Sequence, residues 1–444
     1  MIETFIVFLC AILAGIFSGL MPGVGGLVVM SIAFPFLMEM DPVNILVFYI
    51  VLISIDQYFN GITAIIFALP GSSMNVPTLI EGHALFKNGS GGKAVMYAAL
   101  GSWFASIFSV LLIIALLPIL YSIYGIWTTL IQAILFGIAT VTVILVSRNN
   151  VFVSILFFLL GGTLAQVGYD LEKGEPVLTF GFEILYNGIP TMPLLASLFV
   201  LPVLITNYHK KHGKIEFVGV TVKGYIDTIL DLKHYWVTLV RSSFLGSIGG
   251  FVPGLSYAFS SIFSYTIERW IRQRKNTYNY NGDVNCLIAS ESANNAGAFT
   301  QMIPLLFLGI PITASEALIY NILVSRGLPI DIEWFSNTFE TIVVFFVISA
   351  TIGMLLAGKY VNLLKVLNGV NIGYLYIGIM SVLIVLIYLV GTSEYSGIEY
   401  VIIAACLVPL GLCFVGRDST PLIFGFILHE PLYDAFYRIY ALYF

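Results

Sequence analysis

The chain has 444 residues, of which 59% are hydrophobic and only 10% are charged, with a mean hydropathy of +0.97. Since soluble domains carry roughly 25% charged residues, this composition excludes an ordinary soluble protein and indicates a polytopic membrane protein. The net charge of −5 argues against a protein that binds nucleic acid. Apolar runs recur along the whole length without a polar block of domain size, so we expect one integral membrane domain in contact with lipid.

The first apolar stretch, residues 2–38, consists of two arms around the turn-forming run Pro22-Gly23-Val24-Gly25-Gly26. At about 1.5 Å per residue each arm would be roughly 27 Å long, which favours a re-entrant hairpin. An acidic residue, Glu3, stands where a signal peptide has basic residues, and no small-residue cleavage site follows. We therefore expect this stretch to stay in the mature protein.

The second apolar region, residues 45–86, is broken by Pro70-Gly71-Ser72-Ser73 and carries Asp56 and Asn60 on its first arm. Ordinary transmembrane helices are expected after it, near residues 94–120, 122–146, 151–168 and 186–206. The basic stretch 209–235 then predicts a cytoplasmic linker. It divides the chain into a first transmembrane repeat, residues 1–208, and a second, residues 236–444.

The second half begins with residues 236–270, which are broken at Pro253-Gly254. Residues 285–325 follow, an apolar stretch that carries Glu291 and is interrupted at Gly309 and Pro311. Backbone groups that lose their helical partners at membrane depth are tolerated only where they are buried in protein or line a wet cavity. Ordinary spans are expected again near residues 334–358, 371–389, 398–415 and 422–442.

The two halves match motif by motif, with the Pro-Gly breaks and the acid-to-amide spacing in the same order. The corresponding residues are Pro22 and Pro253, Pro70 and Pro311, Asp56 and Glu291, and Asn60 and Asn295. Loops at equivalent positions carry opposite charge, and Lys and Arg favour the cytoplasmic side, so the repeats should be inverted. We predict an all-α polytopic membrane protein of two inverted-topology repeats, with about ten transmembrane helices, re-entrant hairpins and broken helices.

The breaks form the candidate substrate site, because restarted helices expose N–H groups that bind carboxylates and no Lys or Arg lies centrally in either broken region. The predicted substrate-binding residues are Gly23, Gly25, Gly26, Pro70, Gly71, Ser72, Ser73, Pro253, Gly254, Ser256, Gly309, Pro311, Thr313 and Ser315. Ionisable and amide side chains at membrane depth suit a coupling ion, either Na⁺ or H⁺. The predicted coupling-ion residues are Asp56, Asn60, Glu291, Asn294 and Asn295.

The sequence predicts no enzyme, no cofactor and no metal site. Its four Cys residues form no CxxC pair and its five His residues fit no HExxH pattern. The nucleotide motif GxxxxGK[ST] is absent, which argues against direct drive by ATP. A channel or exporter on the same scaffold and an intramembrane enzyme are the alternatives. Polar residues that gather at the breaks, and acids that fall in separate halves, favour a secondary active transporter instead.

Long motifs carry a resemblance to a known family. They are GLMPGVGG from Gly19, FNGITAIIFALPGSSMNVPTLIEGHALFKNGSGGKA from Phe59, LTFGFEILYNGIP from Leu178, SESANNAGAFTQMIPLLFLGIP from Ser290 and STPLIFGFILHEPL from Ser419. Over nearly the whole chain they resemble the large membrane subunit of the tripartite tricarboxylate transporters, the TctA family. The resemblance implies an ion-gradient-driven importer of tricarboxylates or other small organic anions, multi-pass in the cytoplasmic membrane. It also implies two partners, a small four-helix membrane subunit and an extracytoplasmic solute-binding protein.

The chain departs from the family pattern at two of its breaks. Leu255, Ser256 and Tyr257 stand where the family is rich in glycine, and Ile312 stands where the family has a small residue. More apolar walls predict that a mono- or dicarboxylate with an apolar body competes better than citrate. The sequence leaves open the substrate, the coupling ion, the presence of both partners and the oligomeric state, a homo-oligomer among the options.

Overall fold

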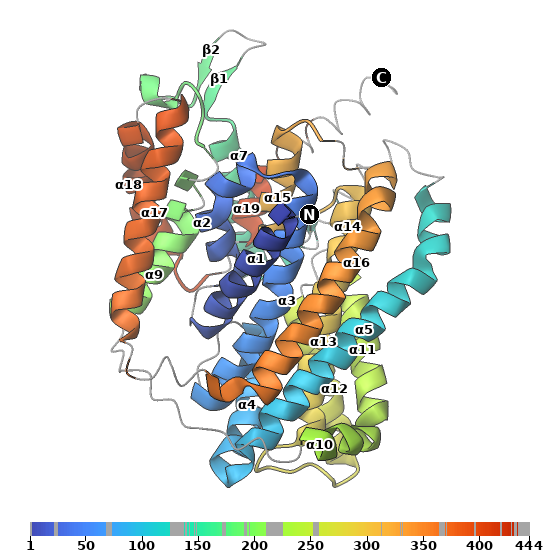
Figure 1. The fold of residues 1–444 in the computed structure, drawn as a ribbon. Coiled ribbons are helices and arrows are strands. Elements are labelled where there is room, and N and C mark those ends of the chain that lie inside the picture. The colour runs from blue at the N-terminus through green and yellow to red at the C-terminus, as the bar shows by residue number, and fades with distance from the viewer. Residues whose placement is uncertain are drawn as a thin grey trace.

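The computed structural model of the chain is built almost entirely of helices (Figure 1). It describes residues 2–21, 25–67, 73–124, 137, 140–141, 143–145, 147, 149–170, 175–190, 193–194, 196–209, 225–251, 257–311, 313–328, 330, 332–363, 369, 371–394, 397–417, 420–427, 429 and 433. One short antiparallel hairpin, β1 (Gly168–Asp170) with β2 (Glu175–Val177), stands apart from the helices. The predicted all-α membrane fold is confirmed, with this hairpin as an addition between α7 (Val151–Ala165) and the rest of the chain.

Separate helices flank each predicted break of the first half. They are α1 (Ile2–Leu20) and α2 (Gly26–Glu39) around the first break, and α3 (Pro42–Phe67) and α4 (Val76–Leu85) around the second. A 3-10 turn, η1 (Ser73–Asn75), leads into α4, and Pro77 lies in the first turn of that helix, where a missing N–H is tolerated. The π-helical segment η2 (Phe86–Ser90) bends at Gly89 (φ 77°) and joins α4 to the long α5 (Gly91–Tyr124).

The end of the first half differs from the predicted helix at residues 186–206. After α7 (Val151–Ala165), residues 183–190 form the 3-10 turn η3 (Glu183–Leu185) and a turn at Gly188, whose φ is 81°. The prediction was wrong here because the turn chemistry of Gly188 and Pro190 outweighs the apolar run. Helical structure follows in η4 (Ala196–Val200) and α9 (Leu201–His209). The predicted linker is described only from α10 (Tyr225–Asp231) and η5 (Leu232–Tyr235) onward.

The second half repeats the arrangement of separate helices around breaks. Its elements are α11 (Trp236–Phe251), α12 (Tyr257–Arg274), α13 (Val284–Thr300), α14 (Met302–Leu308), α15 (Ala314–Ser325), α16 (Ile332–Met354), η6 (Leu355–Lys359), α17 (Ile372–Glu394), α18 (Gly397–Phe414) and α19 (Thr420–Ile427). The predicted break at Gly309 and Pro311 therefore lies between α14 and α15.

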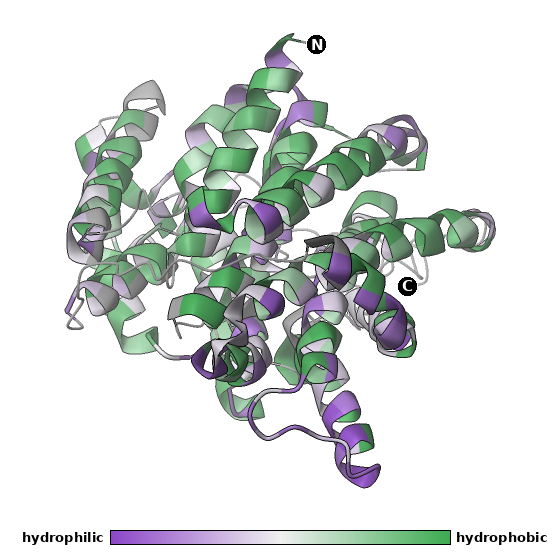
Figure 2. Cartoon of the chain, turned by 60° about the horizontal axis from the view of Figure 1, so that its bottom comes forward, coloured by the Kyte–Doolittle hydropathy of each residue, from purple (hydrophilic) through white to green (hydrophobic). Residues whose placement is uncertain are grey.

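The helices carry the apolar surface of a multi-pass membrane protein. Five apolar stretches among the described residues are long enough to cross a bilayer: Ile2–Leu20, Pro42–Ile66, Val76–Ser122, Ile332–Lys359 and Gly397–Phe414. Figure 2 shows the long helices covered mainly by apolar residues, with hydrophilic residues gathered near their ends. Since α1 alone is long enough to cross, the re-entrant geometry of the first hairpin stays a prediction.

The contacts between helices follow a pattern in which the two halves exchange roles (Figure 1). Helix α1 packs on α3 as α11 packs on α13, and α16 packs on α3 as α5 packs on α13. Two repeats related by a pseudo-two-fold axis would give this exchange. The inverted direction of the repeats stays a prediction.

Close backbone packing holds α13 in the centre of the second half. A Cβ added at Gly246 of α11 would lie 2.3 Å from the Ala293 carbonyl oxygen, and one added at Gly250 would lie 2.4 Å from the Gly297 carbonyl oxygen. Small residues spaced by four let membrane helices approach in this way. The side chains on the remaining faces of α13 are thereby fixed in position.

The inverted arrangement can be tested by labelling single cysteines at equivalent loops. In a chain whose native cysteines are replaced by alanine, Asn150→Cys and Ser396→Cys should react with a membrane-impermeant maleimide from opposite faces of the membrane. Inside-out and right-side-out vesicles provide the two measurements. Labelling of both positions from one face would contradict the inverted repeat.

Candidate functional site

The predicted substrate residues divide according to which of them the structure describes. Gly23, Pro70, Gly71, Ser72, Pro253, Gly254 and Ser256 lie outside the described residues, and their role stays a prediction. Ser73 begins η1. Gly25 and Gly26 start α2, and a Cβ added to either would meet nothing within 4 Å. The described packing around Gly25 and Gly26 therefore leaves room for a side chain at both positions.

The break between α14 and α15 is closed by local hydrogen bonds. Gly309, in the left-handed region with φ 68°, ends α14, and Pro311 is buried in the turn that follows. Thr313 caps α15: its Oγ1 accepts from the Glu316 N–H at 3.3 Å, and Glu316 Oε2 accepts from the Thr313 N–H at 3.1 Å. The first turn of α15, which contains Ser315, thus already holds a carboxylate of the chain itself.

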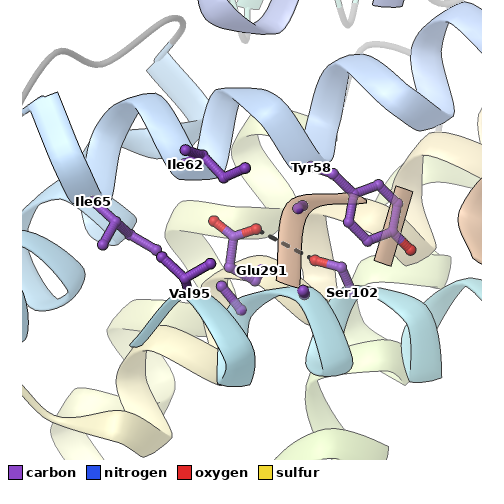
Figure 3. A pocket seen from close by; sticks show the side chains of 9 residues that line it. Tyr58, Ile62, Ile65, Val95, Ser102 and Glu291 are labelled. Carbon is purple, nitrogen blue, oxygen red and sulfur yellow. Dashed lines mark hydrogen bonds between the residues drawn. The ribbon is translucent and has the colours of Figure 1, made fainter. Parts of the chain in front are cut away.

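The second predicted carboxylate, Glu291, lies on α13 with 2% of its surface exposed and is held by the first half of the chain. Thr78 of α4 donates a hydrogen bond to Glu291 Oε1. Ser102 of α5 donates to Oε2 at 3.3 Å (Figure 3). Gly61 of α3 lies against it, since a Cβ there would come 3.2 Å from Oε2. Asn295 donates to Ser102 Oγ at 2.7 Å. Both halves of the chain therefore build this site.

A small cavity opens beside the Glu291 carboxyl group. It is about large enough for one water molecule. Apart from Tyr58, Ser102 and Glu291, its walls are apolar; they are Ile62, Ile65, Val95, Ala98, Ala99 and Ala357 (Figure 3). The ring of Tyr58 forms one end, and its hydroxyl points away from the carboxyl group. The carboxylate therefore faces a low-dielectric surrounding with hydroxyls as its partners.

Asp56, the predicted equivalent of Glu291, has a different surrounding. Asn60, one turn further on α3, donates from Nδ2 to Asp56 Oδ2 at 2.8 Å, and both side chains are buried. Asn294 on α13 is also buried, and neither atom of its amide has a hydrogen-bond partner among the described residues. Asp56 and Glu291 lie inside continuous helices, so the backbone carbonyls beside them are engaged in helical hydrogen bonds. The breaks lie beyond the ends of these helices.

A further carboxylate, Glu81 of α4, is buried with 1% of its surface exposed. Its Oε1 accepts from Tyr278 Oη at 2.7 Å and from Tyr265 Oη at 3.1 Å, and its Oε2 accepts from the Asp283 N–H at 2.8 Å. Asp283 in turn caps α13 by accepting from Asn285 N and Cys286 N. Glu81 therefore ties α4 to the start of the helix that carries Glu291.

The tyrosines around Glu81 act as neutral donors. Burial, followed by the neighbouring Glu81 carboxylate, raises the pKa of the Tyr278 hydroxyl above its ordinary value. Arg269 lies over the Tyr278 ring, 5.2 Å from its centroid, and donates to Tyr265 Oη at 3.0 Å. Sequence reasoning missed this cluster because the loop that carries Tyr278 is distant from Glu81 in the chain.

Within the part of the chain that the structure describes, no group of three or more His, Cys, Asp or Glu residues could hold a metal ion.

The chain is similar in sequence to one known family and to several uncharacterized proteins. A sequence model of the tripartite tricarboxylate transporter TctA family matches residues 5–423. An uncharacterized 52.8 kDa protein in the TAR-I ttuC' 3'region of Agrobacterium vitis is 27% identical over 96% of this chain and 85% of its own length. An uncharacterized protein in the TAR-II ttuC' 3'region of the same organism is 28% identical over 44% of this chain and 79% of its own length. Methanocaldococcus jannaschii protein MJ1079, also uncharacterized, is 24% identical over 59% and 60% respectively. No solved structure matches the chain.

The Glu81 cluster can be tested through stability. Glu81→Ala leaves two tyrosine hydroxyls and the Asp283 N–H without their acceptor, so we expect the free energy of unfolding to fall by about 3 kcal/mol. Thermal unfolding in detergent provides the measurement. Glu340→Ala, on the exposed face of α16, is the matched control. Equal melting temperatures for the two variants would show that Glu81 does not tie α4 to α13.

Proposed function

Because the chain belongs to the tripartite tricarboxylate transporter TctA family, we propose that it is an ion-coupled importer of small carboxylates in the cytoplasmic membrane. It would work with a small four-helix membrane subunit and an extracytoplasmic solute-binding protein, which the tripartite organisation of the family supports. The ion gradient supplies the free energy, and the chain supplies the path and the coupling site.

The observation that carries this proposal is the position of Glu291. A carboxylate at membrane depth costs several kcal/mol, so such residues mark ion and substrate paths. Glu291 is buried on α13, while its hydrogen-bond donors, Thr78 and Ser102, belong to the first half. A relative movement of the halves would change these hydrogen bonds. Binding of an ion at Glu291 is therefore sensitive to the conformational change that alternating access requires.

The same logic extends to the other predicted coupling residues. Asp56 and Asn60 on α3 form a buried acid–amide pair, and Asn294 brings a buried amide without a described partner. Asn295 orients Ser102 beside Glu291. Together these residues place charge and amide groups on two helices, α3 and α13, that pack against each other at the junction of the halves.

Helix ends at the breaks supply the hydrogen-bond donors for an anionic substrate. The start of α15 illustrates the chemistry, because the Thr313 N–H already donates to the Glu316 carboxylate. A substrate carboxylate would bind the restarted helices in the same manner, through N–H groups and the hydroxyls of residues such as Ser72 and Ser315. Leu255 and Ile312, near two of the breaks, make an apolar substrate body favourable.

Uptake into proteoliposomes tests the proposal. The chain, co-reconstituted with its two partner subunits, should accumulate a radiolabelled dicarboxylate only under an ion gradient. Glu291→Gln should abolish accumulation, because the amide keeps the shape and hydrogen bonding but carries no charge. Glu340→Gln should leave accumulation unchanged, because the Glu340 side chain is exposed.

Competition experiments identify the substrate class: unlabelled mono- and dicarboxylates should compete more strongly than citrate. Equal competition by a neutral sugar would contradict a carboxylate site.

A further inference from the structure

We propose that the ion bound at Glu291 is a proton, and that the hydroxyl groups of Thr78, Ser290 and Ser261 form the path along which this proton arrives and leaves. The inference rests on the proposed function and deepens it, because it names the coupling ion and the residues that conduct it.

The surroundings of Glu291 suit a neutral carboxylic acid. Both described donors to its carboxyl group, Thr78 and Ser102, are neutral hydroxyls, and the cavity beside it is lined mainly by aliphatic side chains. None of the ion pairs formed by described residues includes Glu291. An isolated charge in such a place is costly, and protonation removes the cost. A protonated Glu291 also keeps one oxygen as an acceptor and gains an O–H donor.

The same surroundings offer little to a metal cation. A dehydrated Na⁺ needs several oxygen ligands, and in transporters unwound carbonyls supply many of them. Around Glu291 the described backbone belongs to the helices α3, α4, α5 and α13, whose carbonyls are engaged in helical hydrogen bonds. The described polar groups that contact the carboxylate are the hydroxyls of Thr78 and Ser102, which already donate to it. The site therefore favours a proton over Na⁺.

The two oxygens of Glu291 have different connections. On the Oε2 side, Asn295 Nδ2 donates to Ser102 Oγ at 2.7 Å, which directs the Ser102 hydroxyl hydrogen toward the carboxyl group. An amide does not release its proton at ordinary pH, so Asn295 cannot pass a proton to Ser102 and on to Glu291. On the Oε1 side, Thr78 Oγ1 lies 2.9 Å from Ser290 Oγ. Hydroxyls both donate and accept, so a proton can move on this side.

The hydroxyl chain continues toward the break that precedes η1. Ser290 Oγ lies 3.5 Å from Ser261 Oγ, and Ser261 donates to the Met74 carbonyl oxygen at 2.8 Å. For protonation, Thr78 gives its proton to Glu291 Oε1 and takes one from Ser290, and Ser290 takes one from Ser261. Ser261 takes its replacement proton from a hydronium ion of the solvent, which becomes water; release runs in the opposite direction. The Ser261 hydroxyl must turn from Met74 toward Ser290, so this longest link would control the rate. Thr78 lies on α4 and Ser261 lies on α12, whereas Ser290 lies on α13 beside Glu291.

The other titratable groups near α13 form no hydrogen bond or ion pair with Glu291 among the described residues. Tyr58, from α3, is the titratable side chain that shares the cavity with Glu291, and its hydroxyl points away. Cys286 lies on α13 itself, more than one turn before Glu291. The charged or titratable groups on the packed helices contact other partners: Asp56 contacts Asn60, Glu81 contacts Tyr265 and Tyr278, Glu268 contacts Arg241, His83 contacts the Ile65 carbonyl, Tyr97 contacts Asp231, and Arg272 contacts Asp283.

Infrared difference spectroscopy of the full chain in lipid tests the proton site without a substrate. Lowering the pH should produce the C=O stretching band of a protonated carboxylic acid, shifted in D₂O. A component of this band should disappear in Glu291→Gln and persist in Glu340→Gln, and replacing K⁺ by Na⁺ should leave it unchanged. A band that is identical in Glu291→Gln, or one that Na⁺ suppresses in the unmodified chain, would overturn the proposal.

Proton-driven uptake by relay variants tests the path. Ser290→Ala and Thr78→Val should slow uptake driven by a pH gradient severalfold, and Thr78→Ser should restore it. Ser349→Ala is the matched control, because Ser349 is equally buried and its hydrogen bond among the described residues is to the Phe346 carbonyl of its own helix. The infrared band of Glu291 in Ser290→Ala shows that the variant folds and binds its proton. Unslowed uptake in both relay variants would overturn the path.

The two proposals fail in different ways. Carboxylate uptake that is driven by a Na⁺ gradient and is insensitive to a pH gradient would overturn proton coupling and leave carboxylate import standing. Absence of carboxylate uptake under either gradient, together with an intact Glu291 infrared band, would contradict the proposed function and leave the proton site standing.

Discussion

The rest of the structure depends on one constraint, the need of a buried carboxylate for hydrogen-bond donors. Glu291 lies on α13, but the donors of its described hydrogen bonds come from α4 and α5 of the other half. Gly61 of α3 leaves the space in which the carboxyl group lies. Leaving such a group without its donors costs its full desolvation free energy. The halves therefore cannot separate at this point without a change in the protonation or the partners of Glu291.

The surrounding helices are arranged so that this site is held precisely in place. Gly246 and Gly250 bring α11 into backbone contact with one face of α13. At the start of α13, Asp283 caps the helix, and Glu81 binds the Asp283 N–H from α4. The helix that provides Thr78 is thus the one that also fixes the beginning of α13. Position and chemistry at Glu291 are set by the same pair of helices.

The sequence predicted the features that depend on local chemistry. Glu291 was identified because an acid interrupts an apolar stretch, and the break at Gly309 followed from glycine and proline. The partners Thr78 and Ser102 were not predicted, because hydroxyls are common in membrane helices and their pairing depends on how α4, α5 and α13 pack. The Thr313 cap was readable from the Thr-x-x-Glu spacing that ends at Glu316. The partners of Glu81 were not predicted, because Tyr265, Tyr278 and Asp283 lie far from it in the chain.

A double-mutant cycle between Glu291 and Thr78 tests the central claim most directly. The free energies of unfolding of the unmodified chain, Glu291→Leu, Thr78→Val and the double variant give the coupling between the two side chains. If the halves are joined at this carboxylate, the coupling should be about 1 kcal/mol, within the range found for hydrogen bonds between membrane helices. Effects of the two substitutions that add to within about 0.3 kcal/mol would contradict the account.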